Sequence, residues 1–482
     1  MERGRASQSG RPTLARRVSF RDYVGIGLGS IVGVGWILVA GDWLMRGGPM
    51  GTILAFLIGG FLFISVGKCY AELTPALPLA GGEIAFAYKA FGTGYSFLTG
   101  WMLAFGYVTL GPFETTSLGW LFEFMVPSLK SAPLYEIGGF GVGWSSIIPG
   151  LAIGVLVMYV NYRGVKHSAT FQLVSTVVLL ACAAVFSFVA FTKGSFSNLQ
   201  PLFAGSGSFV DSFGGFIAVL AVVPWFLAGF DAIPQAAEEA GDEVDPKALG
   251  RAVIVSIIGG AFFYALVIAA ISTVMPWQET VGFEMPPVEV FTAAFGMDWV
   301  SKMVLFTGFL GLITSFNGIF LAASRVLFAA GRGGLLPAWF GVLDKKHRTP
   351  KNAILFAGVI ALVGPFLGKS ILIPIVDVGA FGFVISMALT CIAAIRLRKI
   401  APDLKRPYRV KHVYTFYIGL LISGGLFFLM IIPGSPAQLV WPVEYVVLVL
   451  WMIVGYAAYR FRLQKADMSE EERAVQILGE YR

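Results

Sequence analysis

Residues 29–36 read GSIVGVGW and stand in the middle of an apolar run that extends from residue 23 to 45. A second stretch, PWFLAGFD at residues 224–231, stands in the middle of a later apolar run, 214–240. Clustered glycine or proline at mid-span predicts an interrupted membrane helix, whose unpaired N–H and C=O groups must then meet a ligand, an ion or water. Interruptions at corresponding places of oppositely oriented helices indicate an inverted repeat with a binding site at the bilayer midplane.

The glycines of the first stretch also permit a second interpretation. Gly25, Gly29 and Gly33 are spaced four residues apart, a pattern that by itself is typical of close helix packing. The paired cluster at 224–231, with the ionisable Asp231 beside it, favours a break in both helices. An interrupted helix presents N–H groups to an anion and C=O groups to a cation, so the pattern suits a zwitterion.

The composition is that of a polytopic membrane protein. Of the 482 residues, 57% are hydrophobic and only 13% are charged. A helix needs about 20 apolar residues to cross a bilayer. Twelve apolar runs are long enough or nearly so: 23–45, 51–69, 96–126, 144–161, 169–192, 214–240, 252–275, 301–330, 352–367, 371–395, 414–433 and 440–460.

Lys and Arg are distributed very unevenly between the two sides of this layout. The side that holds both termini carries 30 of them and the other side carries five. Because cytoplasmic loops are enriched in Lys and Arg, we expect both termini in the cytoplasm and the protein in the plasma membrane.

Several other classes of protein are excluded by the same data. The net charge of +7 does not indicate nucleic-acid binding, because no stretch outside the apolar runs is long enough for a basic domain. The three cysteines have neither disulfide nor zinc spacing. The apolar runs contain no histidine and no loop contains a phosphate-binding motif, so we expect neither an enzyme nor an ATP-driven pump.

Five segments together resemble the amino acid, polyamine and organocation transporter superfamily. They occur in the expected order over about 400 residues: GSIVGVGW (29–36), PLAGGEIAFAYKAFG (78–92), GFDAIPQAAEEAGDE (229–243), SRVLFAAGRGGLLPAWFGVLDKKHRTPKNA (324–353) and LKRPYRV (404–410). The resemblance implies an all-α membrane protein with twelve transmembrane helices in the LeuT-type fold. In that fold helices 1–5 and 6–10 form two inverted repeats, helices 1 and 6 are discontinuous, and two C-terminal helices follow.

This fold divides the chain into four parts: a cytoplasmic tail (1–22), a transporter core (23–395), helices 11 and 12 (396–460) and a second cytoplasmic tail (461–482). By position, the resemblance places substrate contacts at both breaks. They are Ser30, Ile31, Gly33, Val34 and Gly35 in helix 1, and Trp225, Ala228 and Gly229 in helix 6. The family has a small polar residue where this chain has Val34, which leaves the identity of the substrate open.

Two buried carboxyl groups are candidates for coupling or gating. Asp231 follows the helix 6 break, where it either takes up a proton or orders the break by hydrogen bonding. Glu114 follows Gly111 and Pro112 in helix 3, in its expected outer half. It either attracts a cationic substrate from outside or pairs with a neighbouring helix.

Thr314 and Ser315 form a hydroxyl pair in helix 8, which faces helix 1 in the LeuT-type fold. In sodium-coupled proteins of this fold, such a pair joins helix 1 carbonyl groups around the ion. Alternatively, each hydroxyl bonds the backbone of its own helix. We predict no other cofactor or metal.

An acidic stretch follows the second break and contains Glu238, Glu239, Asp242, Glu243 and Asp245. It either clamps Arg325 or Arg332 when the inner gate closes or forms a solvated turn.

The sequence therefore predicts a secondary transporter that imports an amino acid or a related organic amine by alternating access, coupled to protons or sodium. Two alternatives remain: a permease for a non-zwitterionic amine such as ethanolamine or a polyamine, and an amino acid exchanger. The expected partners are the small-molecule substrate and the lipid bilayer, without nucleic acid. The sequence gives no signal for an oligomeric state.

Overall fold

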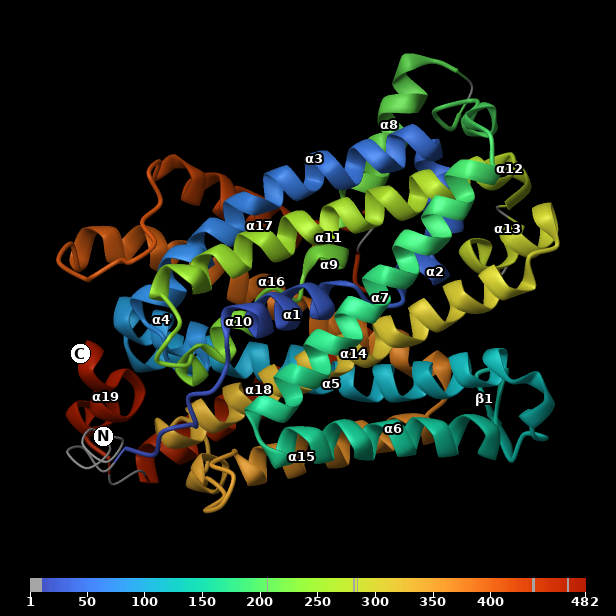
Figure 1. Ribbon diagram of the computed structural model, residues 1–482. Coiled ribbons are helices and arrows are strands. Elements are labelled where there is room, and N and C mark those ends of the chain that lie inside the picture. Colours follow the sequence, from blue (N-terminus) through green and yellow to red (C-terminus); the bar gives the residue numbers. More distant parts are fainter. Residues whose placement is uncertain (1–10, 206, 281, 284, 436–437, 466–467) are drawn as a thin grey trace.

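The computed structural model describes residues 11–205, 207–280, 282–283, 285–435, 438–465 and 468–482. Most helices run side by side along one axis (Figure 1). The first described residues and the C-terminal helix lie at the same end of this bundle, where Arg11 Nε donates to the carbonyl of Gln476 at 2.9 Å. We call this end the terminal face and the other end the opposite face.

Nine long helices form the body of the bundle. They are α3 (Ala40–Ala76), α5 (Thr93–Met125), α6 (Trp144–Arg163), α7 (Val165–Lys193), α11 (Pro246–Val274), α14 (Asp298–Arg332), α16 (Lys369–Ile400), α17 (Tyr414–Ile431) and α18 (Val443–Lys465). Their apolar composition explains this architecture, because a helix is one of the few structures that satisfy every backbone hydrogen bond within lipid.

Ten shorter helices complete the described part of the chain. They are α1 (Phe20–Ile31), α2 (Gly35–Leu38), α4 (Gly82–Phe91), α8 (Phe209–Leu220), α9 (Val223–Leu227), α10 (Ala232–Gln235), α12 (Trp277–Thr280), α13 (Pro286–Phe295), α15 (Lys351–Val363) and α19 (Glu470–Leu478). Six single 3-10 turns are η1 (Pro127–Leu129), η2 (Phe196–Leu199), η3 (Ala237–Glu239), η4 (Ala338–Gly341), η5 (Gly364–Phe366) and η6 (Gly479–Tyr481).

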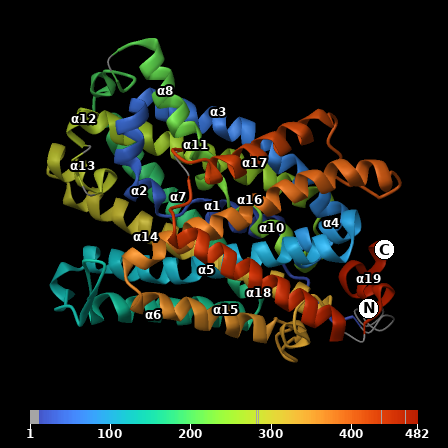
Figure 2. The same ribbon diagram turned by 180° about the vertical axis from the view of Figure 1, so that it is seen from behind.

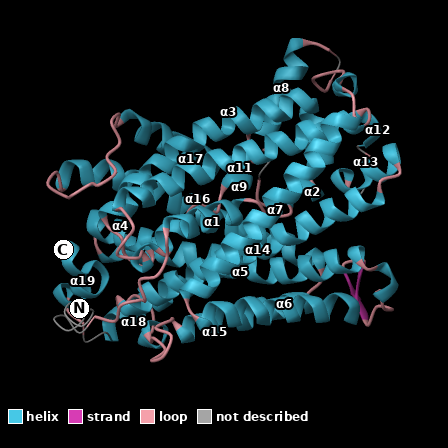
Figure 3. Ribbon diagram, viewed as in Figure 1, coloured by secondary structure: helices cyan, strands magenta, loops and turns pink. Residues whose placement is uncertain are grey.

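Only one pair of strands occurs among the described residues. β1 (Tyr135–Ile137) and β2 (Phe140–Val142) are antiparallel, with Tyr135 opposite Val142. This hairpin lies at the opposite face, beyond the ends of α5 and α6 (Figure 3).

Nine helical stretches of the described residues are long and apolar enough to cross a membrane, which confirms a polytopic helical membrane protein. All twelve predicted apolar runs coincide with helices. The run 23–45 is broken into α1, α2 and the start of α3, and the run 214–240 is broken into α8, α9 and α10. α4, α12, α13 and α19 were not predicted as helices.

α14 is the central helix of the bundle, and most of its side chains are buried. It packs against α1, α5 and α7. α17 and α18 are mostly exposed and pack on the outside, against α16 (Figure 2). The apolar side chains of α17 and α18 are therefore in the position of a lipid-facing surface.

A sharp turn separates the first two predicted runs inside α3. Gly48 has a φ of 66°, a conformation that glycine adopts at little cost. A Cβ atom at this position would lie 2.6 Å from the backbone nitrogen of Ala204. The chain can therefore reverse here only because residue 48 has no side chain.

Candidate functional site

The helix 1 break lies where the glycine cluster predicted it. α1 begins at Phe20, after the cap residue Ser19, whose hydroxyl accepts from the N–H of Asp22, and it ends at Ile31. Val32 leaves the helical conformation with a ψ of 82°, and α2 begins three residues later. The carbonyl of Ile31 is freed by the break and accepts a hydrogen bond from Tyr264 Oη of α11 at 2.9 Å.

Three N–H groups after this break have no hydrogen-bond acceptor among the described residues: those of Val34, Gly35 and Trp36. Gly33 and Gly35 also keep exposed surface in the middle of the bundle. A buried N–H without a partner is unfavourable, so this segment is poised to bind an acceptor such as a carboxylate.

The helix 6 break lies between α9 and α10. Ala228 is extended, with a ψ of 155°, and Gly229 has a φ of 118°. A Cβ atom on Gly229 would lie 2.7 Å from the carbonyl carbon and oxygen of Ser30. The two breaks therefore meet backbone to backbone in the middle of the protein.

The eight predicted substrate residues differ in their solvent exposure. Gly33, Gly35, Trp225, Ala228 and Gly229 keep exposed surface. Ser30, Ile31 and Val34 are at most 6% exposed, and the Ser30 hydroxyl donates to the carbonyl of Ile26 in its own helix at 2.6 Å. The structure thus brings Gly229 against Ser30 and Ile31, and a Cβ atom on Gly35 would meet the Phe226 ring. Trp225 packs instead on the apolar cluster that contains Phe105 and Phe381.

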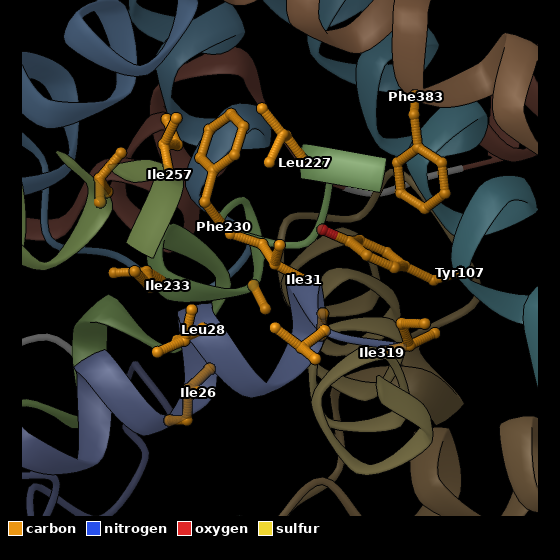
Figure 4. Close-up of a cluster of buried hydrophobic side chains, with 14 of the residues drawn as sticks. Ile26, Leu28, Ile31, Tyr107, Leu227, Phe230, Ile233, Ile257, Ile319 and Phe383 are labelled. Atoms are coloured by element: carbon orange, nitrogen blue, oxygen red, sulfur yellow. The ribbon is translucent and has the colours of Figure 1, made fainter. Parts of the chain in front are cut away.

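Asp231 forms hydrogen bonds at the helix 6 break, as in the prediction that it orders this break. Its Oδ1 accepts from the N–H of Gly229 at 2.9 Å. Its Oδ2 accepts from the hydroxyl of Tyr107 in α5. Figure 4 shows this hydroxyl pointing from α5 towards the segment between α9 and α10, with Ile31 nearby.

Glu114 is 4% exposed and pairs with a neighbouring helix, the second of its two predicted interpretations. Ser315 Oγ of α14 donates to Glu114 Oε1 at 2.7 Å, whereas Oε2 has no partner among the described residues. A Cβ atom on Gly33 would lie 3.7 Å from Ser315 Oγ. Glu114 is therefore one hydrogen bond away from the helix 1 break.

Thr314 and Ser315 have different partners. Thr314 Oγ1 donates to the carbonyl groups of Leu310 and Gly311 in its own helix, at 3.0 and 3.1 Å, while Ser315 is engaged by Glu114. The described residues contain no group of three or more His, Cys, Asp or Glu side chains that could hold a metal ion. A sodium ion at Thr314 and Ser315 remains a prediction.

A buried polar network holds α14 against α6 and α7. Asn317 Nδ2 donates to Gln172 Oε1 at 2.7 Å, and Gln172 Nε2 donates to the carbonyl of Thr314 at 2.9 Å. Asn161 Nδ2 donates to Asn317 Oδ1 at 2.8 Å. The sequence analysis did not single out these amides, although amide side chains within apolar runs were a signal for them.

The acidic stretch after the break divides into two parts. Glu239 forms a bidentate ion pair with Arg325, at 2.9 and 3.0 Å, and both side chains are almost completely buried. Glu238 pairs with Arg332 at 2.8 Å and with Arg11 at 3.2 Å. These two acids form the predicted clamp.

The rest of the acidic stretch is different. Asp242 is largely exposed and pairs with the exposed Arg16, and Asp245 caps α11.

The ion pairs of the clamp also change the pKa of Glu238. Burial alone would raise this pKa. The guanidinium groups of Arg332 and Arg11 outweigh burial and lower this pKa to about 2.

The chain ends close the terminal face over this clamp. The N–H groups of Arg17 and Val18 donate to the carbonyl of Glu239 at 2.8 and 2.9 Å. Arg11 connects Glu238 to the carbonyl of Gln476 in α19. Segments predicted as tails therefore contact the region directly below the helix 6 break.

A separate cavity of about 330 Å³ lies at the opposite face, between the end of α5, the hairpin and the start of α6. Trp120, Glu123, Lys130 and Phe140 are among its lining residues. It contains none of the residues at the two breaks, so it is distinct from the central site.

The comparisons with known proteins agree with this architecture. The amino acid permease family matches residues 18–454. The chain is 28% identical over 463 residues to the branched-chain amino acid permease BcaP of Bacillus subtilis (strain 168), covering 94% of each chain. It is 27% identical over 463 residues to the methylthioribose transporter of the same organism, covering 94% of this chain and 95% of that one.

A plant protein is also similar. The cationic amino acid transporter 7, chloroplastic, of Arabidopsis thaliana is 26% identical over 375 residues, covering 76% of this chain and 63% of the plant protein. These matches confirm the resemblance that the five sequence segments indicated. The chain belongs to the amino acid permease family.

Proposed function

We propose that this protein is a secondary transporter that imports an amino acid by alternating access in symport with protons. The observation that carries the proposal is the contact of the two helix breaks at Gly229 and Ser30, beside three N–H groups without acceptors. Such a junction offers donors to a carboxylate and carbonyl groups to an amine.

The helices are compatible with the LeuT-type layout of twelve spans. Helix 1 corresponds to α1, α2 and the start of α3, and helix 6 corresponds to α8, α9 and α10. α17 and α18 take the places of the two helices outside the inverted repeats. The excess of Lys and Arg on the side of the termini supports a terminal face that lies in the cytoplasm of a plasma-membrane protein.

The substrate class follows from what the junction offers. The N–H groups of Val34, Gly35 and Trp36 favour a carboxylate, and the Phe226 ring beside Gly35 leaves an apolar boundary for the rest of the molecule. The named substrates of the relatives include branched-chain and cationic amino acids. We therefore propose an amino acid with an apolar or long side chain.

Glu114 supports a second candidate, a permease for an amine without a carboxylate. Its Oε2 has no partner among the described residues and is close to the helix 1 break. A carboxylate in this position can pair with an ammonium group. An ethanolamine or polyamine permease would use this contact in place of the N–H groups of residues 34–36.

Protons are favoured over sodium by the contacts of the candidate groups. Asp231 and Glu114 are buried and form no ion pair with any described residue. The Thr314 hydroxyl is directed to its own helix. A carboxyl group in such surroundings can exist in its neutral form and carry a proton.

The proposal is tested with purified protein in proteoliposomes. We expect uptake of a radiolabelled mixture of the twenty common amino acids to increase when the outside is acidified, and to ignore an imposed sodium gradient. Unlabelled amino acids should compete, whereas ethanolamine and putrescine should not. Competition by the two amines alone would instead support the second candidate, and uptake indifferent to both gradients would support an exchanger.

A further inference from the structure

Glu83 is a buried acid that the transport site described above does not use. It lies in the first turn of α4, the short helix in the connection between α3 and α5, and its exposed fraction is 0%. α4 packs against α5, α10, α14 and α16. Glu83 therefore lies between the helix 6 break and the terminal face.

The carboxyl group of Glu83 belongs to a cluster of polar side chains from four elements. Gln235 Nε2 of α10 donates to Glu83 Oε2, and the same nitrogen lies 3.2 Å from the backbone carbonyl of Asp231. The hydroxyl group of Tyr70 in α3 neighbours this carboxyl, and that of Thr390 in α16 neighbours Tyr70. All of these side chains are at most 2% exposed.

Glu83 Oε1 and Gln235 Oε1 have no well-aligned hydrogen-bond partner among the described residues. The same is true of Tyr70 Oη and Thr390 Oγ1, although Tyr70 is close enough to Glu83 to stabilise its ionised form. Buried polar atoms without partners are rare in folded proteins, and each one requires an explanation. Several in one place indicate a site where a proton or water enters during function. The cluster is not adequately explained as structural support.

No cation among the described residues balances the charge of Glu83. The guanidinium of Arg325 is engaged by Glu239 and that of Arg332 by Glu238. The titratable groups that face the cluster are Cys69 and Tyr70 of α3, Tyr107 of α5, Asp231 beside α10, and Cys391 of α16. Burial, followed by the negative charge of Asp231, raises the pKa of Glu83 to about 8.

We propose that Glu83 binds and releases the coupling proton on the terminal side of the helix 6 break, and that Gln235 transmits its protonation state to that break. The proposal rests on the proton-coupled function above. The proton arrives on the Glu83 carboxylate from the Asp231 side and leaves to water at the terminal face when α10 moves. One O–H bond forms and one breaks at each transfer.

Gln235 provides the link because its side-chain amide has a hydrogen-bond donor, Nε2, and a hydrogen-bond acceptor, Oε1. An ionised Glu83 accepts from Nε2, and this orientation also lets Nε2 reach the carbonyl of Asp231. A protonated Glu83 gains an O–H donor, which pairs with Gln235 Oε1 when the amide turns. Turning the amide removes the donor from the Asp231 carbonyl, at the residue where α10 begins.

The test compares Glu83→Gln with Glu444→Gln in proteoliposomes that contain a pH-sensitive dye. Glu444 is a control because it is also a buried acid, 1% exposed, but it lies in α18 and its Oε2 accepts only from the N–H of Val440. The probe is an equimolar mixture of the twenty common amino acids, radiolabelled for uptake. Exchange of internal for external amino acids is measured in parallel.

We expect Glu83→Gln to exchange amino acids at the wild-type rate, with no dependence on pH between 5.5 and 8.5, and to lose at least about nine-tenths of its proton-driven uptake. Glu444→Gln should behave as the wild type. Wild-type proton influx per amino acid in Glu83→Gln would overturn the role of Glu83 alone. Wild-type protein that takes up amino acids without proton influx would overturn the proposed coupling and, with it, this inference.

A second variant keeps the inference testable if Glu83→Gln does not fold. Tyr70→Phe removes the hydroxyl that stabilises the ionised carboxyl but leaves Glu83 in place. We expect the pH midpoint of uptake to move upward by about half a unit. An unchanged midpoint in a folded Tyr70→Phe protein would contradict the inference.

Discussion

The buried acids at the terminal face and those in the middle of the bundle have opposite surroundings. At the terminal face, Glu238 and Glu239 face the guanidinium groups of Arg332 and Arg325. In the middle, Asp231 and Glu114 accept from the hydroxyl groups of Tyr107 and Ser315 and form no ion pair among the described residues. A buried charge without a counter-charge readily becomes neutral, whereas a paired charge is held.

This difference assigns different tasks to the two regions. The ion pairs at the terminal face fasten η3, which follows the helix 6 break, to α14. Under the proposed proton coupling, the acids in the middle change protonation while the protein remains folded. Removing the charge should therefore damage the fold at the terminal face and the coupling in the middle.

The largest effect is expected from Glu239→Gln, which leaves the fully buried Arg325 without its counter-charge. Breaking a buried ion pair by removing one partner costs about 3–5 kcal/mol of stability. We expect a large fall in the melting temperature of the detergent-purified protein. The matched control is Asp242→Asn, because Asp242 pairs with Arg16 at an exposed site. Equal melting temperatures for the two variants would remove the distinction between the regions.

Gly229→Ala should have the next largest effect. The new Cβ would require a strained φ of 118° and would lie 2.7 Å from Ser30. We expect uptake to fall at least about tenfold, because strain of this kind costs roughly 1–3 kcal/mol and the two breaks must separate. Gly424→Ala is the control, because a Cβ at Gly424 in α17 meets nothing within 4 Å. Full uptake by Gly229→Ala would show that the breaks need not touch.

Asp231→Asn tests the middle of the bundle. In contrast to Glu239→Gln, it should leave the stability of the protein unchanged and alter the pH dependence of uptake. The amide keeps an oxygen for the N–H of Gly229 and cannot titrate, and its NH2 group donates to the Tyr107 hydroxyl, which donates in the wild type. We expect a melting temperature close to that of the wild type and uptake that no longer responds to external pH. A strongly destabilised Asp231→Asn that retains the pH response would mean that Asp231 is purely structural.

Ser315→Ala should have a smaller effect, confined to affinity. It removes the donor to Glu114 without adding volume near Gly33. The loss of one hydrogen bond to a neutral carboxyl group corresponds to about 0.5–1.5 kcal/mol, so the concentration for half-maximal uptake should rise about two- to tenfold. Thr307→Ala is the control, because the Thr307 hydroxyl donates to Met303 in its own helix. Equal affinities in both variants would separate Glu114 from the substrate site.

The smallest effect concerns pH: the loss of stability caused by Glu238→Gln should not depend on pH in the neutral range. The pKa of Glu238 is lowered from its ordinary value of 4.5 to about 2, so the stability from its ion pairs is complete above about pH 5 and is lost only as the pH falls from 4.5 through 2. We therefore expect Glu238→Gln to lower the melting temperature by the same amount at pH 5.5 and pH 8. A difference between these two values would indicate that the terminal face also titrates.

The sequence was sufficient to locate both breaks. Glycine and proline at mid-span are detectable because they contradict an otherwise continuous apolar helix, and the breaks at 32–34 and 228–231 lie within the quoted stretches. The clamp was only one of two interpretations, because its partners in α14 are 86 and 94 residues away. The partners of Thr314 and Ser315 were harder still to predict, because adjacent residues of a helix point in different directions.

Other functional contacts could not be predicted from a local pattern. The hydroxyls of Tyr107 and Tyr264 meet the breaks from helices 124 and 233 residues away in the chain. Glu83 stands in a quoted segment, but its burial depends on α10 and α16 packing over α4. Such contacts follow from the tertiary arrangement, which one sequence does not specify in detail.

The most direct test of the account is a cryo-EM density map of the protein saturated with the amino acid that competes best for uptake. The account predicts ligand density between residues 33–36 and 228–229, with the carboxylate within about 3 Å of the N–H groups of Val34, Gly35 or Trp36. Density in the cavity beside Trp120 and Glu123, with none at the two breaks, would contradict it.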